Sequence, residues 1–125
     1  MRSFFLAALV LSGCDHDRVK PGPVEPVKTV PTEPRWRSID ANILKPRCLK
    51  CHQPPQSKGG VDLSSLSTLL ASPGTLFSPL VAQVPESSGL YLKVADGSMP
   101  PGKTKLSAAD KAAVAEWIRR GALDD

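Results

Sequence analysis

The sequence predicts a small all-α domain of three to five short helices joined by long loops. Apolar residues recur at helical spacing in several short segments, and no alternating strand pattern of any length is present. The 13 prolines and nine glycines gather between these segments, where they favour loops and turns. With 125 residues, the chain has room for one such domain and a tail.

The first 13 residues are typical of an export signal. Arg2 precedes an apolar run, FFLAALVL, which falls short of the roughly 20 apolar residues of a membrane-spanning helix but suits a signal peptide. The run ends in Leu-Ser-Gly-Cys, which resembles the lipobox of bacterial lipoproteins. That resemblance implies removal of residues 1–13 and lipid attachment to Cys14. The exported chain would then be anchored on the periplasmic side of a bacterial membrane, inner or outer. An ordinary signal peptide with an incidental cysteine is the alternative.

Residues 14–35 combine this cysteine with a proline-rich tether. Five prolines within residues 15–35 alternate with valine and charged residues, and no apolar periodicity remains. Proline fixes φ and donates no backbone hydrogen bond, which favours extended conformations. We therefore expect a semi-rigid spacer between the membrane and a folded domain at residues 36–125.

The first two helices of this domain are expected before and after a turn-rich loop. Ser38 can cap a helix that runs through Leu44, and Pro46 is expected to end or bend it. Leucines at helical spacing predict a second helix within residues 61–71.

A third helix is expected over residues 89–94, capped by one of the two serines before it.

The last helix has the clearest signals. Ser107 and Asp110 form a capping pattern at its start, alanines fill its interior, and Gly121 marks its end. The loops carry few apolar residues, so the core is small and something else is expected to fill the middle of the domain.

Residues 48–52, Cys-Leu-Lys-Cys-His, carry the most specific chemistry of the chain. Two thiols one helical turn apart, on Cys48 and Cys51, can add to the two vinyl groups on one edge of a haem, and the adjacent imidazole of His52 then reaches the iron. A zinc site is one alternative. It needs a fourth ligand and usually a second Cys/His pair, whereas the only other histidine, His16, lies in the tether. A thioredoxin-like redox pair is another alternative, but it belongs in a βαβ context that is absent here.

Four segments resemble, in the same order, the single-haem cytochrome c domains of bacterial secreted and membrane-tethered proteins: ILKPRCLKCH, GGVDLSS, SGLYLKVADGSMPPG and LSAADKAAVAEWIRRGA. The resemblance covers roughly residues 36–123 and implies a class I cytochrome c fold around one covalent haem c. In that family a methionine from the loop before the last helix is the sixth iron ligand, which implies Met99 in Ser-Met-Pro-Pro. It also implies a hydrogen bond from the second nitrogen of His52 to the carbonyl of Pro54 or Pro55.

Together these features predict a membrane-tethered single-haem cytochrome that transfers single electrons between redox partner proteins. Ligation by His52 and Met99 leaves no open position on the iron, which suits electron transfer rather than oxygen chemistry. Two alternatives stay open. One is the haem subunit of a larger oxidoreductase complex, and the other is a ligand-binding or sensing haem domain with a displaceable Met99. No acid/base pair predicts a catalytic step, and no small-molecule substrate is expected.

The net charge of +4 is too small and too dispersed to predict nucleic-acid binding. Basic residues nonetheless occur near the predicted haem site, where they could steer the domain to an acidic face on a redox partner or simply lie solvated. These residues are Lys45, Arg47, Lys50, Lys58, Lys93, Lys103 and Lys105.

Apolar residues of the helices are divided between pocket and core. The resemblance also implies that the first and last helices cross in contact, through Ile39, Ile43, Trp117 and Ile118. The candidates for the haem pocket, with the core as the alternative, are Leu63, Leu66, Leu70, Leu80, Tyr91, Leu92 and Val114.

Overall fold

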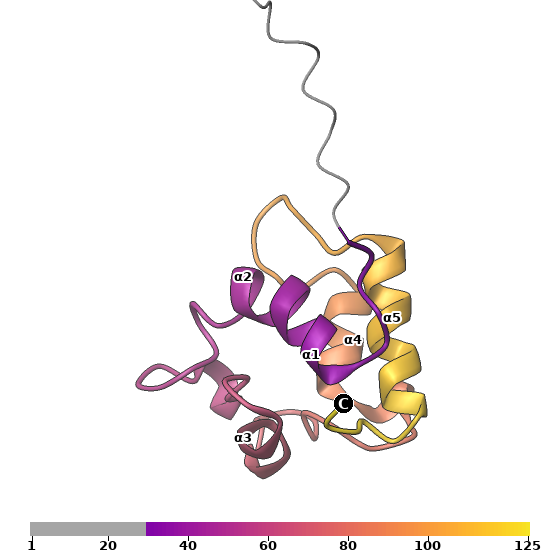
Figure 1. Cartoon of the computed structure of the whole chain (residues 1–125). Helices are drawn as coiled ribbons and strands as arrows, with labels where there is room; N and C mark the ends of the chain where they lie inside the picture. The colour runs from indigo at the N-terminus through magenta and orange to yellow at the C-terminus, as the bar shows by residue number, and fades with distance from the viewer. Residues whose placement is uncertain (1–29) are drawn as a thin grey trace, which may run out of the picture.

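The computed structural model describes residues 30–125, and this part of the chain contains helices and loops but no strand (Figure 1). The helices are α1 (Trp36–Ile39), α2 (Lys45–Arg47), α3 (Leu66–Ala71), α4 (Gly89–Ala95) and α5 (Ala108–Arg119). The prediction of an all-α domain with short helices and long loops is confirmed. None of the helices described has the length and hydropathy of a membrane span. The predicted signal peptide, Cys14 and the tether up to residue 29 lie outside the described residues.

The helices α1 and α2 form one continuous helix, because the π-helical turn Asp40–Leu44 joins them. Pro46 therefore lies in the last turn of the helix, which ends at Arg47, one residue after the proline and before the cysteines. Proline lacks an N–H and its ring collides with the carbonyl four residues earlier in a regular α-helix. The wider π turn, in which the Lys45 N–H donates to the Asp40 carbonyl, accommodates this position.

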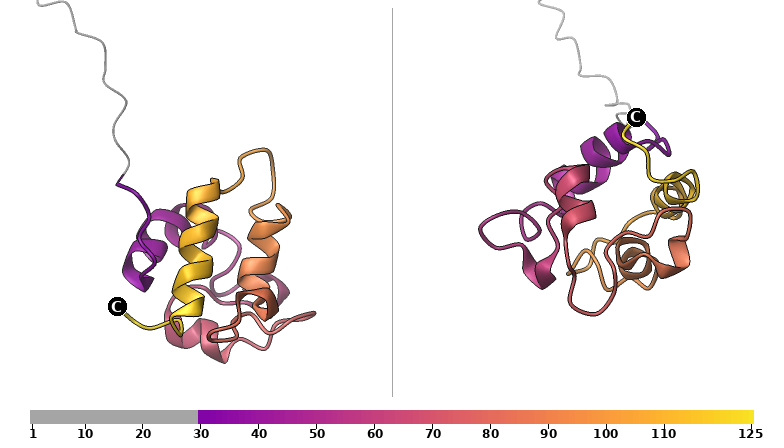
Figure 2. Two further views of the ribbon diagram at one scale, coloured as in Figure 1. Left: turned by 90° about the vertical axis from the view of Figure 1, so that its right-hand side faces the viewer. Right: turned by 90° about the horizontal axis from the view of Figure 1, so that it is seen from below.

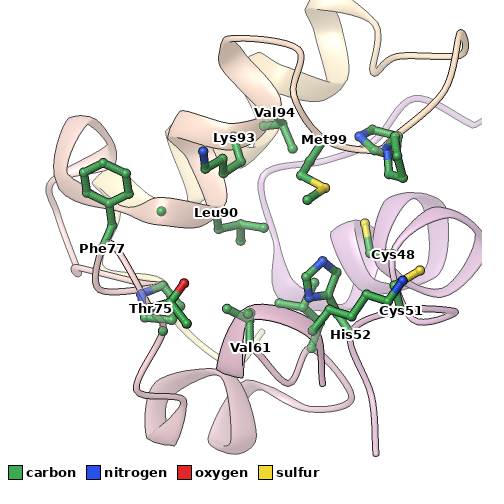
Figure 3. A pocket seen from close by; sticks show the side chains of 18 of the residues that line it. Cys48, Cys51, His52, Val61, Thr75, Phe77, Leu90, Lys93, Val94 and Met99 are labelled. Carbon is green, nitrogen blue, oxygen red and sulfur yellow. The ribbon is translucent and has the colours of Figure 1, made fainter. Parts of the chain in front are cut away.

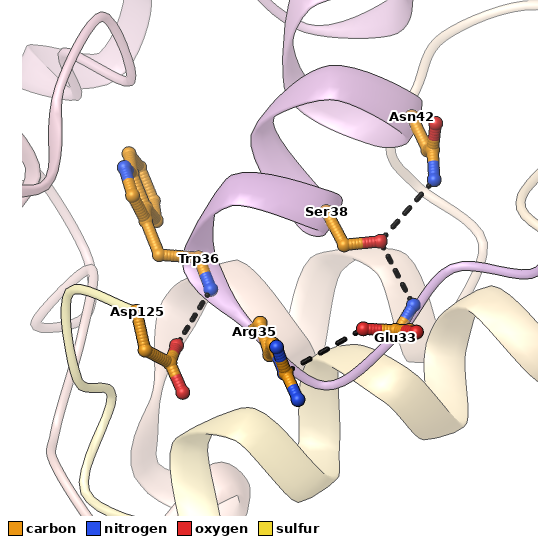
Figure 4. Close-up of polar contacts among 6 residues, drawn as sticks. All are labelled: Glu33, Arg35, Trp36, Ser38, Asn42 and Asp125. Atoms are coloured by element: carbon orange, nitrogen blue, oxygen red, sulfur yellow. Dashed lines mark hydrogen bonds and ion pairs between the residues drawn. The ribbon is translucent and has the colours of Figure 1, made fainter.

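The first helix begins at Trp36, two residues before the predicted cap Ser38. Its first N–H groups are satisfied from the other end of the chain. The Trp36 N–H donates to Asp125 Oδ1 at 3.1 Å (Figure 4). The Arg37 N–H donates to the Asp125 carbonyl, also at 3.1 Å. Ser38 Oγ instead accepts hydrogen bonds from the Glu33 N–H and the Asn42 side chain, which fastens the incoming chain to the helix.

The core is centred where the first helix packs against α5 (Figure 2). The rings of Trp36 and Trp117 lie with centroids 5.6 Å apart, tilted by 36°. Ile39, Ile43 and Ile118 are fully buried in the same cluster, as the sequence predicted. On its other side α5 contacts α4. Beyond these two helix contacts, α3 and the loops make up the rest of the described domain.

The second predicted helix begins later than expected, at Leu66. Ser65 caps it by accepting the Thr68 N–H at 3.1 Å, while the Thr68 hydroxyl accepts the Ser65 N–H in return. Asp62 accepts from the N–H and hydroxyl of Ser64, which holds this segment in a turn. Local side-chain bonds therefore replace the first helical turn that the leucine spacing predicted.

The predicted caps of the last two helices differ in outcome. Ser107 accepts the Asp110 N–H at 3.1 Å and so caps α5 as expected. Gly121, with φ of 103°, follows the helix where a left-handed residue is needed. Ser88 precedes α4 in sequence, but its buried hydroxyl accepts the Val81 N–H and bonds the loop carbonyls rather than capping the helix.

Candidate functional site

A cavity of about 680 Å³ opens between the Cys-Leu-Lys-Cys-His segment, α4 and three loops, at residues 58–63, 74–79 and 99–101. Its volume lies within the roughly 300–1,000 Å³ of small-molecule and cofactor sites. A second hollow of about 710 Å³ lies where residues 30–32 meet the start of α5, but no Cys, His or Met lines it. Chemistry rather than size therefore identifies the first cavity as the candidate site.

The four predicted haem-binding residues meet in this cavity (Figure 3). The imidazole of His52 and the thioether of Met99 project into it from opposite sides, and the thiols of Cys48 and Cys51 lie together at one end. The walls between them are apolar, with Val61 among the residues that form them. A flat macrocycle could thus lie between an imidazole and a thioether with two thiols at its edge.

Backbone hydrogen bonds hold the Cys-Leu-Lys-Cys-His segment as a helical turn after α2. The Cys48 N–H donates to the Leu44 carbonyl at 2.8 Å, and the His52 N–H donates to the Cys48 carbonyl at 3.1 Å. This turn puts the two thiols on one side, as residues three apart on a helix do. The next loop is tied back to it, because the His52 carbonyl accepts the Leu63 N–H at 2.8 Å.

The thiol of Cys48 lies in apolar surroundings. Burial raises its pKa to about 11, an effect that the nearby Arg47 opposes only in part. The polypeptide therefore carries a neutral thiol here at pH 7 rather than a reactive thiolate. An uncharged sulfur at the edge of an apolar cavity suits a residue that is to become a thioether.

The imidazole of His52 has a buried nitrogen without a hydrogen-bond partner, Nδ1. The bond to Pro54 or Pro55 that the family resemblance implies is thus absent from this structure. Both prolines lie in exposed turns after the histidine. The backbone and the neighbouring residues hold the ring in the cavity. Its buried Nδ1 lacks the hydrogen bond that a histidine in a protein core usually makes.

Several hydrogen bonds fix the loop that carries Met99, including one from the Ser98 hydroxyl to the Lys93 carbonyl at 3.3 Å. The Met99 N–H donates to the Lys93 carbonyl at 2.9 Å, which ties the loop to α4. The Ser98 N–H donates to Asp96 Oδ1 at 2.7 Å. Beyond the methionine, Lys105 Nζ donates to the Pro100 carbonyl at 2.7 Å. The thioether is therefore presented by a braced loop rather than by a helix.

The apolar wall differs from the prediction in most of its residues. Of the seven pocket candidates only Leu63 lines the cavity, whereas Leu70 points outward and is 59% exposed. Sequence reasoning missed Leu90 and Val94 on α4, although their spacing of four residues places them on one helical face. The core takes Leu66, Leu80 and Val114, and Tyr91 and Leu92 are half-buried outside the cavity lining.

Positive side chains surround the cavity. Four of the predicted basic residues line it: Arg47, Lys50, Lys58 and Lys93. No Asp or Glu is among the lining residues of the described chain. Lys45 does not line the cavity, and its ammonium pairs with Asp40 at 2.7 Å. The mouth of the site therefore attracts anionic groups.

The two alternative chemistries lack their expected context in the described residues. Between residues 30 and 125, no three His, Cys, Asp or Glu side chains come together in a way that could hold a metal ion. The thioredoxin-like pair would need a βαβ unit, and residues 30–125 contain no strand. The cavity, the facing imidazole and thioether, and the paired thiols fit a haem instead.

Comparison with known proteins supports the same cofactor. Residues 48–103 match the sequence model of a family described as Planctomycete cytochrome C, and this span holds both cysteines, His52 and Met99. No curated protein and no solved structure matches the chain at a significant level. The match assigns a cytochrome c domain to this part of the chain. Such a domain implies covalent haem c and haem-based electron transfer.

Proposed function

With a cytochrome c domain over residues 48–103 as the premise, we propose that the chain is a membrane-tethered, single-haem cytochrome that passes single electrons between redox partner proteins. The observation that carries this proposal is the pair of side chains facing each other across the cavity, His52 and Met99 (Figure 3). An imidazole and a thioether together fill both axial positions of a haem iron and favour electron transfer over oxygen chemistry.

Each functional side chain has one task in this proposal. Cys48 and Cys51 hold the haem through thioether bonds, while His52 and Met99 ligate the iron. When bound, the haem supplies one-electron redox chemistry. The polypeptide orients the group and excludes water with the apolar side chains of α4 and the neighbouring loops. A rigid surround keeps both redox states alike, so little reorganisation accompanies each electron.

The bracing of the Met99 loop favours a carrier over a sensing domain. A displaceable ligand needs a segment that can move away. This loop is tied to α4, and Met99 is followed by Pro100 and Pro101, whose φ angles are fixed. Contacts from Lys105 and Asp96 hold it on both sides of the methionine. We therefore assign Met99 as a permanent ligand.

Tethering to a membrane rests on the sequence before the described residues. The apolar run and Cys14 resemble a lipoprotein signal, and the prolines that follow favour an extended spacer. Two or three acyl chains anchor a protein stably where one does not. The proposal therefore places the domain on the periplasmic side of a membrane, within reach of neighbouring redox proteins.

The expected partners carry an acidic face. Arg47, Lys50 and Lys58 are exposed and line the cavity mouth, with no lining carboxylate to offset them. Attraction between exposed charges is screened within about 10 Å at 0.1 M salt. We expect electron exchange with an acidic redox protein to slow as the salt concentration rises. A rate independent of salt would contradict this part of the proposal.

The deciding experiment is an absorption spectrum of the full-length chain, expressed in a bacterium that carries the haem maturation machinery. Spectra are taken oxidised, reduced and with CO. We expect a low-spin spectrum with the weak far-red methionine–iron band, no response to CO, and loss of that band in Met99→Ala. A high-spin spectrum or ready CO binding would favour the sensing alternative. Failure to attach haem covalently would reject the proposal, and stable co-purification with an oxidoreductase would indicate the subunit alternative.

A further inference from the structure

The end of the cavity opposite the two thiols carries its own polar groups. Figure 3 shows Cys48 and Cys51 at one end and Thr75, Phe77 and Lys93 at the other, with the His52 imidazole and the Met99 thioether between them. Lys93 comes from α4, while Thr75 and Phe77 come from the loop after α3. We propose that Lys93 pairs with a haem propionate at this end, with the Thr75 hydroxyl as a further donor; this inference rests on the proposed haem attachment.

The covalent chemistry of the haem determines which of its edges reaches Lys93. The two vinyl groups lie on adjacent pyrrole rings, and the two propionates lie on the remaining pair, across the macrocycle. Thioether bonds at Cys48 and Cys51 therefore direct the propionates away from the thiols. The opposite end of the cavity is where two carboxylates must be accommodated.

Lys93 is the cation that this end supplies, and no carboxylate in the described residues forms a salt bridge with it. Its side chain is half-buried along the cavity, and its ammonium lies 6.0 Å from the centre of the Phe77 ring. Asp96, three residues later, is engaged by the Ser98 N–H instead. A partly desolvated cation beside an aromatic ring gains most from an anion within the cavity.

The rest of the cavity offers no competing anion. None of its lining residues is acidic. The other lining cations of this chain, Arg47, Lys50 and Lys58, are exposed, whereas Lys93 is half-buried. A propionate paired with Lys93 would be shielded from water more than one paired with an exposed lysine. Such a pair lowers the negative charge near the iron and raises the reduction potential.

The first test compares the midpoint potentials of three variants of the haem-loaded full-length chain. Lys93→Met keeps the apolar stem beside Phe77 but removes the charge, and we expect a lower potential than in the wild type. Lys93→Glu changes the charge by two units, so its shift should be about twice as large. Lys93→Arg should restore most of the wild-type potential, because it returns the charge.

The matched control is Lys111→Met. Lys111 is also half-buried beside α4, where its Nζ donates to the Ala95 carbonyl, but it does not line the cavity. We expect a smaller shift that 1 M salt removes, whereas the Lys93→Met shift should persist because a shielded pair is screened less. Equal shifts with equal salt dependence would overturn the proposal.

An infrared measurement reads the propionates directly. Haem enriched in carbon-13 at its propionate carboxyls gives carboxylate bands that can be followed in each variant. The bands should shift in Lys93→Met and remain in place in Lys111→Met. Unchanged bands in Lys93→Met would reject the pairing even if the potential moves. If the proposed haem attachment itself is wrong, the wild-type chain will carry no covalent haem, which separates the two failures.

Discussion

Two regions of the domain differ in how they bury their apolar side chains. Where the first helix meets α5, large apolar side chains fill the space between the helices. In the loop of residues 72–79, which borders the cavity, large apolar side chains are exposed to solvent. We name the first group the helical seam: Trp36, Ile39, Ile43, Trp117 and Ile118, none more than 8% exposed. The second, the cavity loop of residues 72–79, holds Leu76 at 77% and Phe77 at 51% exposed. The seam stabilises the polypeptide by its own packing. The apolar side chains of the loop stay exposed in the polypeptide alone, and a haem in the cavity would bury them.

The largest expected effect comes from the seam. Trp117→Ala removes a fully buried indole that packs at a tilt against the ring of Trp36 and donates to the Leu123 carbonyl at 2.9 Å. We expect a loss of about 3–5 kcal/mol in the free energy of unfolding, measured by chemical denaturation. Phe77→Ala is the comparison in the cavity loop, and its cost should be well below that. Equal costs would break the distinction between the two regions.

Within the cavity loop, the backbone conformation at Gly74 favours glycine over other residues. Its φ is +62°, and a Cβ at this position would collide with the Phe77 carbonyl oxygen. Gly74→Ala should therefore cost about 1–3 kcal/mol and shift the loop that borders the cavity. Gly102→Ala is the control, because it shares a positive φ but no atom lies within 4 Å of its Cβ. Matching losses of stability in the two variants would show that the backbone angle alone, and not the clash, is responsible.

Removing one serine helix cap from each region is expected to have smaller effects on stability, and these effects should differ between the two regions. Ser107→Ala removes the cap of α5, a helix of the seam, and should lower the global stability by about 1 kcal/mol. Ser65→Ala removes the cap of α3 on the cavity side. There we expect faster hydrogen exchange confined to α3 with little change in global stability. A global loss from Ser65→Ala as large as that from Ser107→Ala would mean that α3 unfolds only with the seam.

The smallest expected effect is the change in the methionine–iron band as the pH falls. Hydrogen bonds from Ser98 lower the pKa of the Asp96 carboxyl, with smaller contributions from the charges of Lys93 and Lys111. A lowered carboxyl pKa stabilises the fold above the ordinary value near 3.9, and this contribution is lost as the pH falls through the lowered value. We expect the methionine–iron band to weaken below about pH 4.

The matched variants for Asp96 separate charge from hydrogen bonding. Asp96→Asn retains an acceptor for the Ser98 N–H, so its band should depend less on acid than the wild type's. Asp96→Ala should show a weaker band at every pH, because the loop loses the hydrogen bond from the Ser98 N–H. An identical acid response in the wild type and Asp96→Asn would exclude Asp96 as the titrating group.

Local signals predicted those parts of the molecule that local bonds determine. The cap at Ser107 and the glycine at position 121 mark α5 because each acts on its own helix end. The turn that carries Cys48 and His52 is likewise fixed by bonds between near neighbours. Such features depend on a few consecutive residues, so the sequence pattern is enough to find them.

The errors occurred where distant segments decide the structure. The start of the first helix depends on Asp125, which supplies its acceptors from 89 residues away. The outward side chain of Leu70 and the inward ones of Leu90 and Val94 depend on how α3 and α4 sit beside the cavity. Helical spacing places residues on a face, but it does not say which face meets the cavity and which meets water.

The anchoring of residues 32–33 also has a mechanical meaning. Thr32 Oγ1 donates to Asp110 Oδ1 at 2.7 Å, and the Glu33 N–H donates to Ser38 Oγ at 2.9 Å. A pull on the chain before residue 30 is therefore borne first by α5 and the first helix, the strongest part of the fold. The loops around the cavity lie off this line of force. If the proposed tether pulls on the domain, the proposed iron ligands His52 and Met99 would thus stay in place.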